Sequence, residues 1–252
     1  MSVILSVVQQ KGGVAKTTSV ANIGAAFALR QNRVLVVDCD PQGSLTLALG
    51  HDSLAIERTI GDAMLDGGDI PIVETAVENL HLCPSARHLA DVEYLLAPKV
   101  GREKFLARTL ERASGYDFIL LDSPPSLGLL TINGMTSAHA LLVPVTPTIL
   151  GTAGLRDLLA TVEEVKSGIK PDLHVLGAFI TFADRRSVAG ARAEDEIRED
   201  LGEIVFAQTI SRRIAHEYAT QAGTPIIAAE PKSIAALEYA ALAEEILHRV
   251  TA

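Results

Sequence analysis

Residues 10–18, with the sequence Gln-Lys-Gly-Gly-Val-Ala-Lys-Thr-Thr, constrain the fold of this chain more than any other stretch. Before them, residues 3–8 form an apolar run typical of a buried strand, and after them residues 19–30 are expected to form a helix. Strand, glycine-containing turn, Lys-Thr and helix in this order predict a loop that binds phosphate groups. The alternative is a glycine turn that only joins a strand to a helix, and acidic residues at two later strand ends favour the phosphate loop.

The residue types in this loop suit phosphate chemistry. Gly12 and Gly13 allow consecutive backbone N–H groups to point into one concavity, and the N-terminus of the following helix adds partial positive charge. Lys16 supplies a full positive charge, and Thr17 offers a hydroxyl to the Mg²⁺ ion that accompanies nucleotide phosphates. The sequence therefore predicts a nucleotide site at this loop.

The loop departs from the usual pattern at two positions. Glycine is usual six residues before the lysine and directly before it, and here these positions hold Gln10 and Ala15. If the backbone of Ala15 needs a positive φ, the alanine costs on the order of 1 kcal/mol and its methyl group crowds the phosphate path. We expect nucleotide binding to survive and intrinsic hydrolysis to be slow. The predicted nucleotide-binding residues of the loop are Lys11, Gly12, Gly13, Val14, Ala15, Lys16, Thr17 and Thr18.

Two later apolar runs end in carboxylates. Residues 34–37 are followed by Asp38 and Asp40, and residues 118–121 are followed by Asp122. Apolar strands that alternate with amphipathic stretches favour a parallel sheet, in which ligands bind at the carboxyl ends of the strands. These acidic side chains should therefore lie beside the phosphate loop. An Asp-Pro turn remains the alternative for Asp40, and a helix N-cap the alternative for Asp122.

The later segments continue the alternation of strands and helices. Residues 140–143 are expected to form a strand that ends at Pro144, and residues 175–182 are expected to form another. The last helix, residues 233–250, has a polar side rich in glutamate. A helix that binds a membrane surface needs a basic polar face, so this one is expected to pack in the core, and no membrane contact is expected.

Composition bounds the class of protein. With 252 residues, of which 48% are hydrophobic, the chain can bury a large core. Length alone leaves one or two domains open, but α/β folds often use this size as one unit, so we expect residues 1–252 to form a single domain around the phosphate loop. Two cysteines are too few for a disulfide framework, which favours a reducing cytoplasm. A net charge of -9 means that any contact with nucleic acid must come from a local basic patch.

Three motifs together resemble those of the ParA/MinD superfamily of ATPases, and among these the ParA-type partition ATPases. They are the deviant Walker A loop with its second lysine, Lys11, the segment 37–43 around Asp38 and Asp40, and the segment 120–125 around Asp122. The resemblance implies an α/β fold, with a doubly wound, mostly parallel sheet and helices on both faces, as in P-loop NTPases. It also implies ATP and Mg²⁺ as cofactors and slow, partner-stimulated ATP hydrolysis.

The resemblance also implies roles for single residues. Lys16 would hold the β- and γ-phosphates, Asp40 would orient or activate the attacking water, and Thr17, Asp38 and Asp122 would serve the magnesium ion. In the family, Lys11 reaches across a dimer interface to the phosphates of the partner. An ATP-dependent homodimer with Lys11, Lys16 and Asp40 as catalytic residues is therefore expected.

The resemblance to the family also implies which residues contact the nucleotide base and which bind DNA. Residues 210–214 resemble the segment that borders the adenine, so Ser211 and Arg212 are expected to contact the nucleotide, although Ser211 replaces a proline and Arg213 an asparagine. Non-specific binding of double-stranded DNA is expected from basic side chains, which are Arg185, Arg186, Arg213 and Lys232.

The resemblance favours a nucleoid-associated protein that segregates a chromosome or plasmid with a ParB-type centromere-binding partner. Two alternatives stay open. One is a ParA-like ATPase that positions a protein cluster or an organelle, which sequence alone does not separate from the first. The other is a metabolic enzyme that uses the same phosphate loop.

Overall fold

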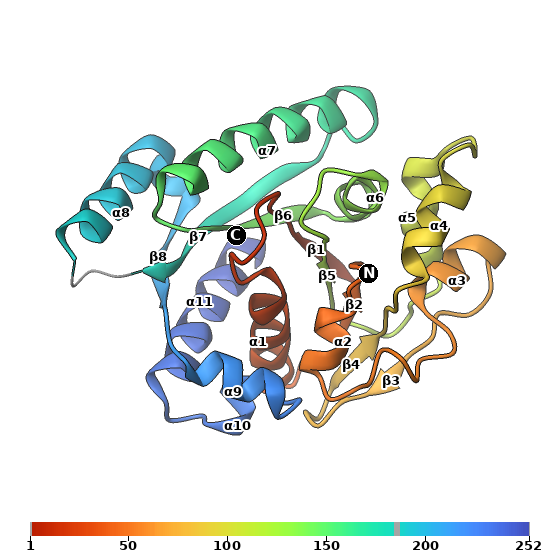
Figure 1. Cartoon of the computed structure of the whole chain (residues 1–252), viewed down its shortest axis with the longest axis horizontal. Helices are drawn as coiled ribbons and strands as arrows, with labels where there is room; N and C mark the ends of the chain where they lie inside the picture. Colours follow the sequence, from red (N-terminus) through yellow and green to blue (C-terminus); the bar gives the residue numbers. More distant parts are fainter. Residues whose placement is uncertain (1, 184–186, 252) are drawn as a thin grey trace.

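The computed structural model describes residues 2–183 and 187–251, and its centre is one eight-stranded sheet (Figure 1). The strand order is β3-β4-β2-β5-β1-β6-β7-β8, and every neighbouring pair is parallel except β3 with β4. The strands are β1 (Val3–Val7), β2 (Val34–Asp38), β3 (Val73–Glu74), β4 (Leu80–Cys83), β5 (Phe118–Asp122), β6 (Ala140–Val145), β7 (His174–Ala183) and β8 (Val205–Ser211).

Helices cover both faces of this sheet (Figure 1). One face carries α1 (Lys16–Ala28), α2 (Ser44–Ala48), α9 (Ala215–Gln221), α10 (Ile226–Ala229) and α11 (Ile234–Thr251). The other carries α3 (Ile60–Asp66), α4 (Leu89–Leu96), α5 (Phe105–Leu110), α6 (Leu129–Ser137), α7 (Ile149–Gly168) and α8 (Val188–Leu201), with short 3-10 turns at Arg102–Lys104 and Gly202–Ile204. The predicted doubly wound, mostly parallel α/β fold is confirmed.

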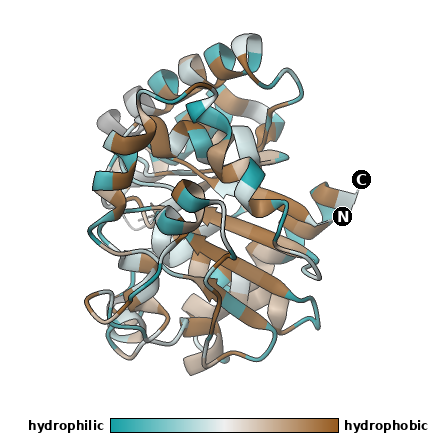
Figure 2. Cartoon of the chain, turned by 90° about the vertical axis from the view of Figure 1, so that its right-hand side faces the viewer, coloured by the Kyte–Doolittle hydropathy of each residue, from teal (hydrophilic) through white to brown (hydrophobic). Residues whose placement is uncertain are grey.

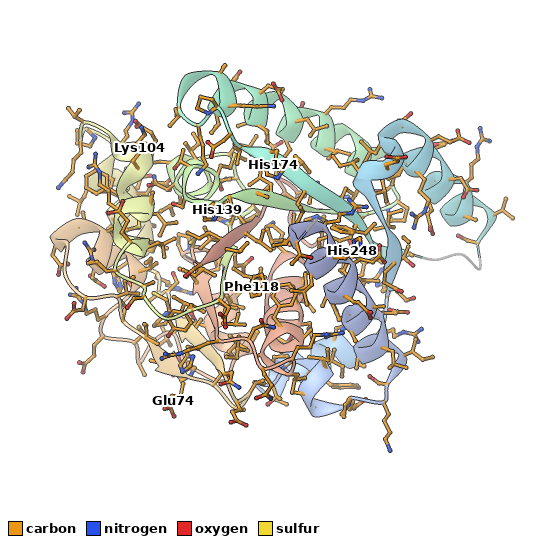
Figure 3. The ribbon with its side chains drawn as sticks, turned by 180° about the vertical axis from the view of Figure 1, so that it is seen from behind. Glu74, Lys104, Phe118, His139, His174 and His248 are labelled. Atoms are coloured by element: carbon orange, nitrogen blue, oxygen red, sulfur yellow. The ribbon has the colours of Figure 1, made fainter. Side chains whose placement is uncertain are left out.

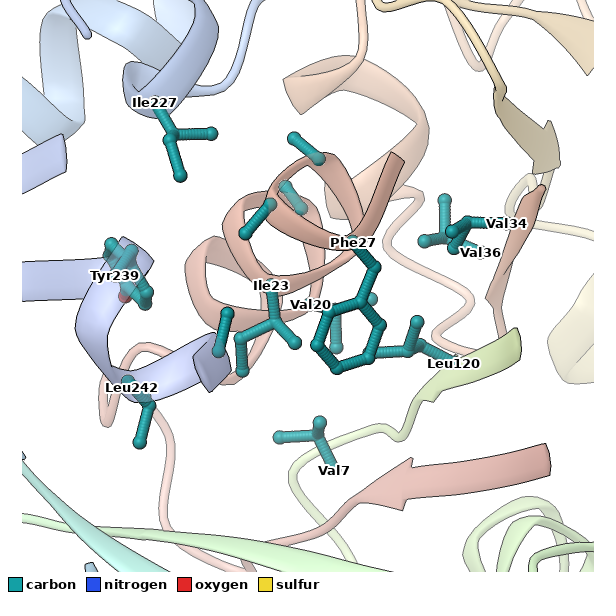
Figure 4. Close-up of a cluster of buried hydrophobic side chains, with 14 of the residues drawn as sticks. Val7, Val20, Ile23, Phe27, Val34, Val36, Leu120, Ile227, Tyr239 and Leu242 are labelled. Carbon is teal, nitrogen blue, oxygen red and sulfur yellow. The ribbon is translucent and has the colours of Figure 1, made fainter. Parts of the chain in front are cut away.

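Alternation along the strands explains the two layers. In β2, Val34 and Val36 belong to the core under α1, whereas Leu35 and Val37 belong to the core on the opposite face. Because successive side chains of a strand point to opposite faces, a continuous apolar run serves both cores. Figure 4 shows Phe27 of α1 packed among such residues, and Figure 2 shows the strands as a mostly hydrophobic interior layer.

The parallel strands all begin along one side of the sheet, the amino-terminal edge, and all end along the opposite side, the carboxyl-terminal edge. Figure 3 labels Phe118, at the start of β5, and His139, just before β6, both at the amino-terminal edge. At the other edge Asp38 and Asp122 end β2 and β5 in register, and Val7 of β1 is the other neighbour of Asp122. The phosphate loop follows β1 directly, so the topology brings the predicted loop and carboxylates to one edge.

The predicted boundaries differ from the structure by one to three residues, and two of the differences have a clear physical cause. Strand β6 does not end at Pro144 but continues to Val145. Pro144 has no N–H to donate, but β1 pairs only with residues as far as Leu142, so no partner strand needs that donor on this side. The first helix begins at Lys16 rather than at residue 19, because the last residues of the loop already adopt helical geometry.

None of the helices in the described ranges is long and apolar enough to cross a membrane.

Candidate nucleotide site

The loop between β1 and α1 has the backbone geometry of an anion-binding turn. Gly13 and Ala15 both adopt left-handed conformations, with φ of 69° and 63°. Ala15 stands at the N-cap position of α1, so the free N–H groups of the first helical turn point toward the concave side of the loop. Ala15 therefore has a positive φ, which is the condition for the expected energetic cost of an alanine at this position.

Lys16 lies inside this loop. Its side chain is buried, and Nζ donates a hydrogen bond to the backbone carbonyl of Lys11 over 3.3 Å. Burial lowers the pKa of Lys16, while the charges of Asp122 and Asp40 act against that shift. The ammonium group thus lies at the loop, with two carboxylates close enough to affect its titration.

Asp122 and Thr17 form the second element of the site. Thr17 Oγ1 donates to Asp122 Oδ2 over 2.7 Å, and the other oxygen, Oδ1, is buried without a hydrogen-bond partner in the described structure. Burial, and then the neighbouring charge of Asp38, raise the pKa of Asp122 well above its ordinary value. An unsatisfied buried carboxylate oxygen beside a threonine hydroxyl fits a magnesium site, since Mg²⁺ takes oxygen ligands.

Asp38 makes hydrogen bonds that the sequence did not reveal. Its Oδ2 accepts from both the backbone N–H and the hydroxyl of Thr46, each over 2.8 Å, and its Oδ1 accepts from the N–H of Asp40 over 3.1 Å. Burial raises the pKa of Asp38 to about 6, even though these hydrogen bonds act to lower it. The carboxylate therefore ties the end of β2 to α2, next to Asp122.

Asp40 lies on the turn after β2 and is partly exposed. Its Oδ1 accepts a hydrogen bond from the N–H of Gln42 over 2.9 Å. Asp40 therefore also stabilises the turn, which is the role that the Asp-Pro alternative predicts. The hydroxyl of Ser85 donates to its backbone carbonyl over 2.8 Å and anchors the turn to the loop after β4. Burial lowers the pKa of Lys16, and the charge of the Asp40 carboxylate acts against that shift, so Asp40 belongs to the same cluster.

The second lysine of the loop has a different environment from the first. Lys11 is partly exposed, and its Nζ donates to Thr148 Oγ1, in the loop between β6 and α7, over 3.3 Å. The backbone carbonyl of Lys11, by contrast, accepts a hydrogen bond from the ammonium group of Lys16. The two ammonium groups are thus held by different partners, one inside the loop and one at its mouth.

The segment predicted to border the base lies at the same edge of the sheet. Ser211 ends β8 opposite Ala183 of β7, and nearby Thr181 donates to the carbonyl of Val14 in the phosphate loop over 3.2 Å. Arg212 is exposed, with its guanidinium carbon 5.9 Å from the centre of the Phe182 ring.

The predicted DNA-binding residues are described only in part. Lys232 is exposed just before α11, and Arg213 is partly buried and forms an ion pair with Glu238 over 3.4 Å. Arg185 and Arg186 lie outside the described residues. Glu238 was seen in the sequence only as a polar residue of the last helix, and no pattern linked it to Ser211 or Arg213.

Across the described ranges, no three His, Cys, Asp or Glu side chains cluster closely enough to hold a metal ion by themselves.

Comparisons with known proteins place this geometry in a family. A family model described as "AAA domain" matches residues 2–175. The sporulation initiation inhibitor protein Soj of Bacillus subtilis is 38% identical over 98% of this chain and 98% of its own length. The chromosome partitioning protein ParA of Caulobacter vibrioides is 34% identical over 98% of this chain and 94% of its own length.

A solved structure is similar over the whole chain. It is the crystal structure of cobyrinic acid a,c-diamide synthase from Mycobacterium smegmatis with bound ADP and magnesium, which is 36% identical to this chain, with a TM-score of 0.87. It covers 100% of this chain and 96% of its own. Taken with the phosphate loop and the acidic strand ends, these matches show that the chain belongs to the ParA/Soj family of P-loop ATPases.

Proposed function

We propose that this chain is an ATP-driven switch that dimerises with ATP and Mg²⁺, binds double-stranded DNA without sequence preference and segregates a chromosome or plasmid. Residues 1–252 would act as one ATPase domain, associated with the nucleoid, together with a ParB-type centromere-binding partner. The observation that carries this proposal is the separation of two lysines in one phosphate loop. Lys16 is buried in the loop, and Lys11 lies at its mouth with its ammonium group on Thr148.

The residues of the cluster supply what phosphoryl transfer needs, which is mainly positioning and charge neutralisation. Lys16 holds the β- and γ-phosphates, in exchange for its present contact with the Lys11 carbonyl. The unpaired oxygen of Asp122 and the hydroxyl of Thr17 would hold Mg²⁺, which when bound would neutralise charge that develops on the phosphates. Asp38 supports this shell from the neighbouring strand.

Asp40 is the candidate for orienting the attacking water. It is the partly exposed carboxylate of the cluster, whereas Asp38 and Asp122 are fully buried. Its backbone is fixed through Ser85 and through the N–H bond to Asp38, so its side chain is held at the carboxyl edge of the sheet. A carboxylate in this position can accept a hydrogen bond from water and turn its lone pair toward the γ-phosphate.

Lys11 distinguishes a dimerising switch from an ordinary hydrolase. Its ammonium group is at the partly exposed mouth of the loop, where a second copy of the chain can approach. In the proposed dimer it leaves Thr148 and contacts the phosphates of the partner. ATP then stabilises the dimer by contacts that ADP lacks, and the DNA-binding residues of two copies act together.

DNA binding under three nucleotide conditions tests this function. Affinity for a random-sequence duplex would be measured with ATP, with ADP and without nucleotide, at two salt concentrations. The proposal predicts tight binding with ATP alone, and a steep loss of affinity at the higher salt concentration, because phosphate contacts release counterions. Equal affinity in all three conditions would contradict it.

A second candidate is amide synthesis, favoured by the similarity to the Mycobacterium smegmatis diamide synthase structure. An enzyme that takes amide nitrogen from glutamine needs a nucleophile such as an activated cysteine. Cys39 and Cys83, the two cysteines of the chain, are both buried, and burial raises the pKa of both thiols well above its ordinary value. A protonated thiol is a weak nucleophile, so partition is favoured. ATP turnover that requires glutamine or ammonia, and ignores DNA and partner, would reverse this choice.

A further inference from the structure

Three donors from residues 211–213, at the end of β8 and just after it, converge on one carboxylate of the last helix. Glu238 Oε2 accepts from the backbone N–H of Ser211 over 2.9 Å, and Oε1 accepts from the Ser211 hydroxyl over 2.7 Å. The guanidinium of Arg213 completes the set, with Nη2 3.4 Å from Oε1. The two residues that depart from the family pattern in this segment, Ser211 and Arg213, are thus both bound to Glu238.

The carboxylate that holds this segment is largely withdrawn from water. The Glu238 side chain is 12% exposed and that of Arg213 is 34% exposed, while Nε of Arg213 is buried without a hydrogen-bond partner in the described structure. Hydrogen bonds to a charged group in such a place are stronger than those at an open surface, and loss of the acceptor leaves buried donors unsatisfied. The position of residues 211–213 therefore depends on Glu238.

The same helix turn is connected to the phosphate loop. Tyr239, the next residue, is fully buried, and its hydroxyl lies 3.1 Å from Ser19 Oγ, in the first turn of α1 after Lys16. Helix α11 thus contacts the helix that follows the phosphate loop and, through Glu238, holds the segment predicted to border the base. It fixes the position of one site relative to the other.

We infer that Glu238 is a positioning residue for nucleotide recognition, which sets residues 211–213 against the base while the loop at residues 11–18 holds the phosphates. The inference rests on the proposed ATP binding and on the prediction from the sequence that Ser211 and Arg212 contact the nucleotide. It assigns to Glu238 an effect on ligands that carry a base, and none on phosphates alone.

Glu245 provides a matched control on the same helix. Its two carboxylate oxygens accept from the backbone N–H groups of Ala207 and Gln208, each over 2.7 Å. Both glutamates therefore fasten α11 to β8 by the same chemistry, but Glu245 binds the strand away from the segment at 211–213. A purely structural role predicts similar effects for the two residues, and a positioning role predicts an effect on ligand choice for Glu238 alone.

The test compares the dissociation constants of ATP, ADP and inorganic tripolyphosphate, all with magnesium, for wild type, Glu238→Ala and Glu245→Ala. We expect Glu238→Ala to weaken ATP and ADP about tenfold, on the scale of one charge-assisted hydrogen bond, and to change tripolyphosphate less than about twofold. Glu245→Ala should leave all three constants unchanged. Glu238→Gln keeps an acceptor for the Ser211 N–H, so it should fold and lose only about threefold in ATP affinity.

Two results would overturn the inference, and a further variant distinguishes their causes. One is unchanged ATP affinity in Glu238→Ala and Glu238→Gln, and the other is an equal loss for ATP and tripolyphosphate. If Arg212→Ala still weakens ATP selectively, the base segment is correctly placed and only the role of Glu238 is wrong. If Arg212→Ala has no selective effect either, the base lies elsewhere, and the inference fails together with that part of the proposed function.

Discussion

At the scale of single residues, the site is built from groups whose charges destabilise the protein without a ligand. Asp38 and Asp122 end neighbouring strands in register, and both are fully buried carboxylates with raised pKa values. Desolvation and like charge both oppose ionisation here, and one oxygen of Asp122 has no hydrogen-bond partner in the described structure. Such a pair is stabilised by a cation, which gives magnesium a thermodynamic as well as a chemical role.

The Asp122→Asn variant should therefore be more stable than wild type when magnesium and nucleotide are absent. The folded protein keeps a proton on Asp122 at a pH where the unfolded chain, with its ordinary value of 3.8, has lost it. Wild-type stability consequently rises as pH falls through the raised pKa, and the variant lacks this contribution. At pH 8 in EDTA we expect a gain of at least about 1 kcal/mol in the free energy of unfolding.

The gain from Asp122→Asn should shrink as the pH is lowered from 8 to 5, because a raised pKa means that lowering the pH favours the protonated, folded wild type. Chemical denaturation at both pH values measures the difference, and magnesium with ADP should stabilise wild type more than the variant. A variant that is less stable than wild type at pH 8 in EDTA would show that the buried carboxylate is not strained.

Ala15 offers a second prediction at this scale. Its φ of 63° belongs to the left-handed region, which glycine enters without the steric cost that a Cβ brings. Ala15→Gly should relieve this strain, raise the free energy of unfolding by up to about 1 kcal/mol and increase ATP turnover or affinity. Thermal unfolding and steady-state hydrolysis measure both effects.

Gly13→Ala makes the reverse substitution at another position of the loop with a positive φ. Gly13 has a φ of 69°, and a Cβ built there meets no atom within 4 Å, so only backbone strain is added. This variant should lose stability by a similar amount. If Ala15→Gly left the free energy of unfolding unchanged while Gly13→Ala lowered it, the backbone of the loop would not be strained at Ala15.

At the scale of helices and strands, close packing of α1 against the sheet fixes the loop that precedes it. Gly24 lies in α1, and a Cβ at this position would be 2.8 Å from Val36 Cγ1 and 3.3 Å from Leu80 Cδ1. Only glycine allows the helix to approach β2 and β4 this closely. Figure 4 shows the same helix surrounded by buried side chains from the sheet and from α11.

Gly24→Ala should therefore destabilise the protein, although alanine is the better helix former. We expect a loss of about 1–3 kcal/mol from overpacking. Gly168→Ala, at the end of α7, meets no atom within 4 Å and should instead be neutral or stabilising by up to about 1 kcal/mol. Urea denaturation of the two variants measures the contrast, and equal effects would mean that α1 can shift to make room.

The sequence predicted elements where one local signal sufficed. The apolar runs before Gly12, Asp38 and Asp122 gave the central strands, and the parallel sheet followed from their alternation with helices. The prediction that β6 ends at Pro144 was wrong, because a proline ends a strand only where a neighbouring strand needs a backbone N–H at that position. Whether that neighbour exists is decided by pairing partners distant in sequence.

Contacts between distant segments could not be predicted in the same way. Thr46 binds Asp38 from α2, a helix of five residues with no recognisable capping signal before it. Glu238 binds Ser211 from 27 residues away, and in the sequence it resembles any glutamate on an exposed helix face. Such partners become visible only when packing brings the elements together.

At the scale of the whole molecule, charge makes DNA binding by one copy unfavourable. The net charge is -9, Arg213 is already paired with Glu238, and α8 carries several acidic residues. A few local cations neutralise too few phosphates to hold DNA against this background, whereas two copies double the contacts. In the proposed function, DNA binding therefore depends on nucleotide-dependent dimerisation.

If Lys11 acts on the nucleotide of the partner subunit, as proposed, the Lys11→Ala variant should lose ATP-dependent dimerisation. Light scattering would give the mass of wild type and variant with ATP, with ADP and without nucleotide. Wild type should form dimers only with ATP, and Lys11→Ala should stay monomeric in every condition, with ADP affinity unchanged because Lys16 stays in the loop. Lys11→Ala that dimerises with ATP as wild type does would show that Lys11 does not act across the interface.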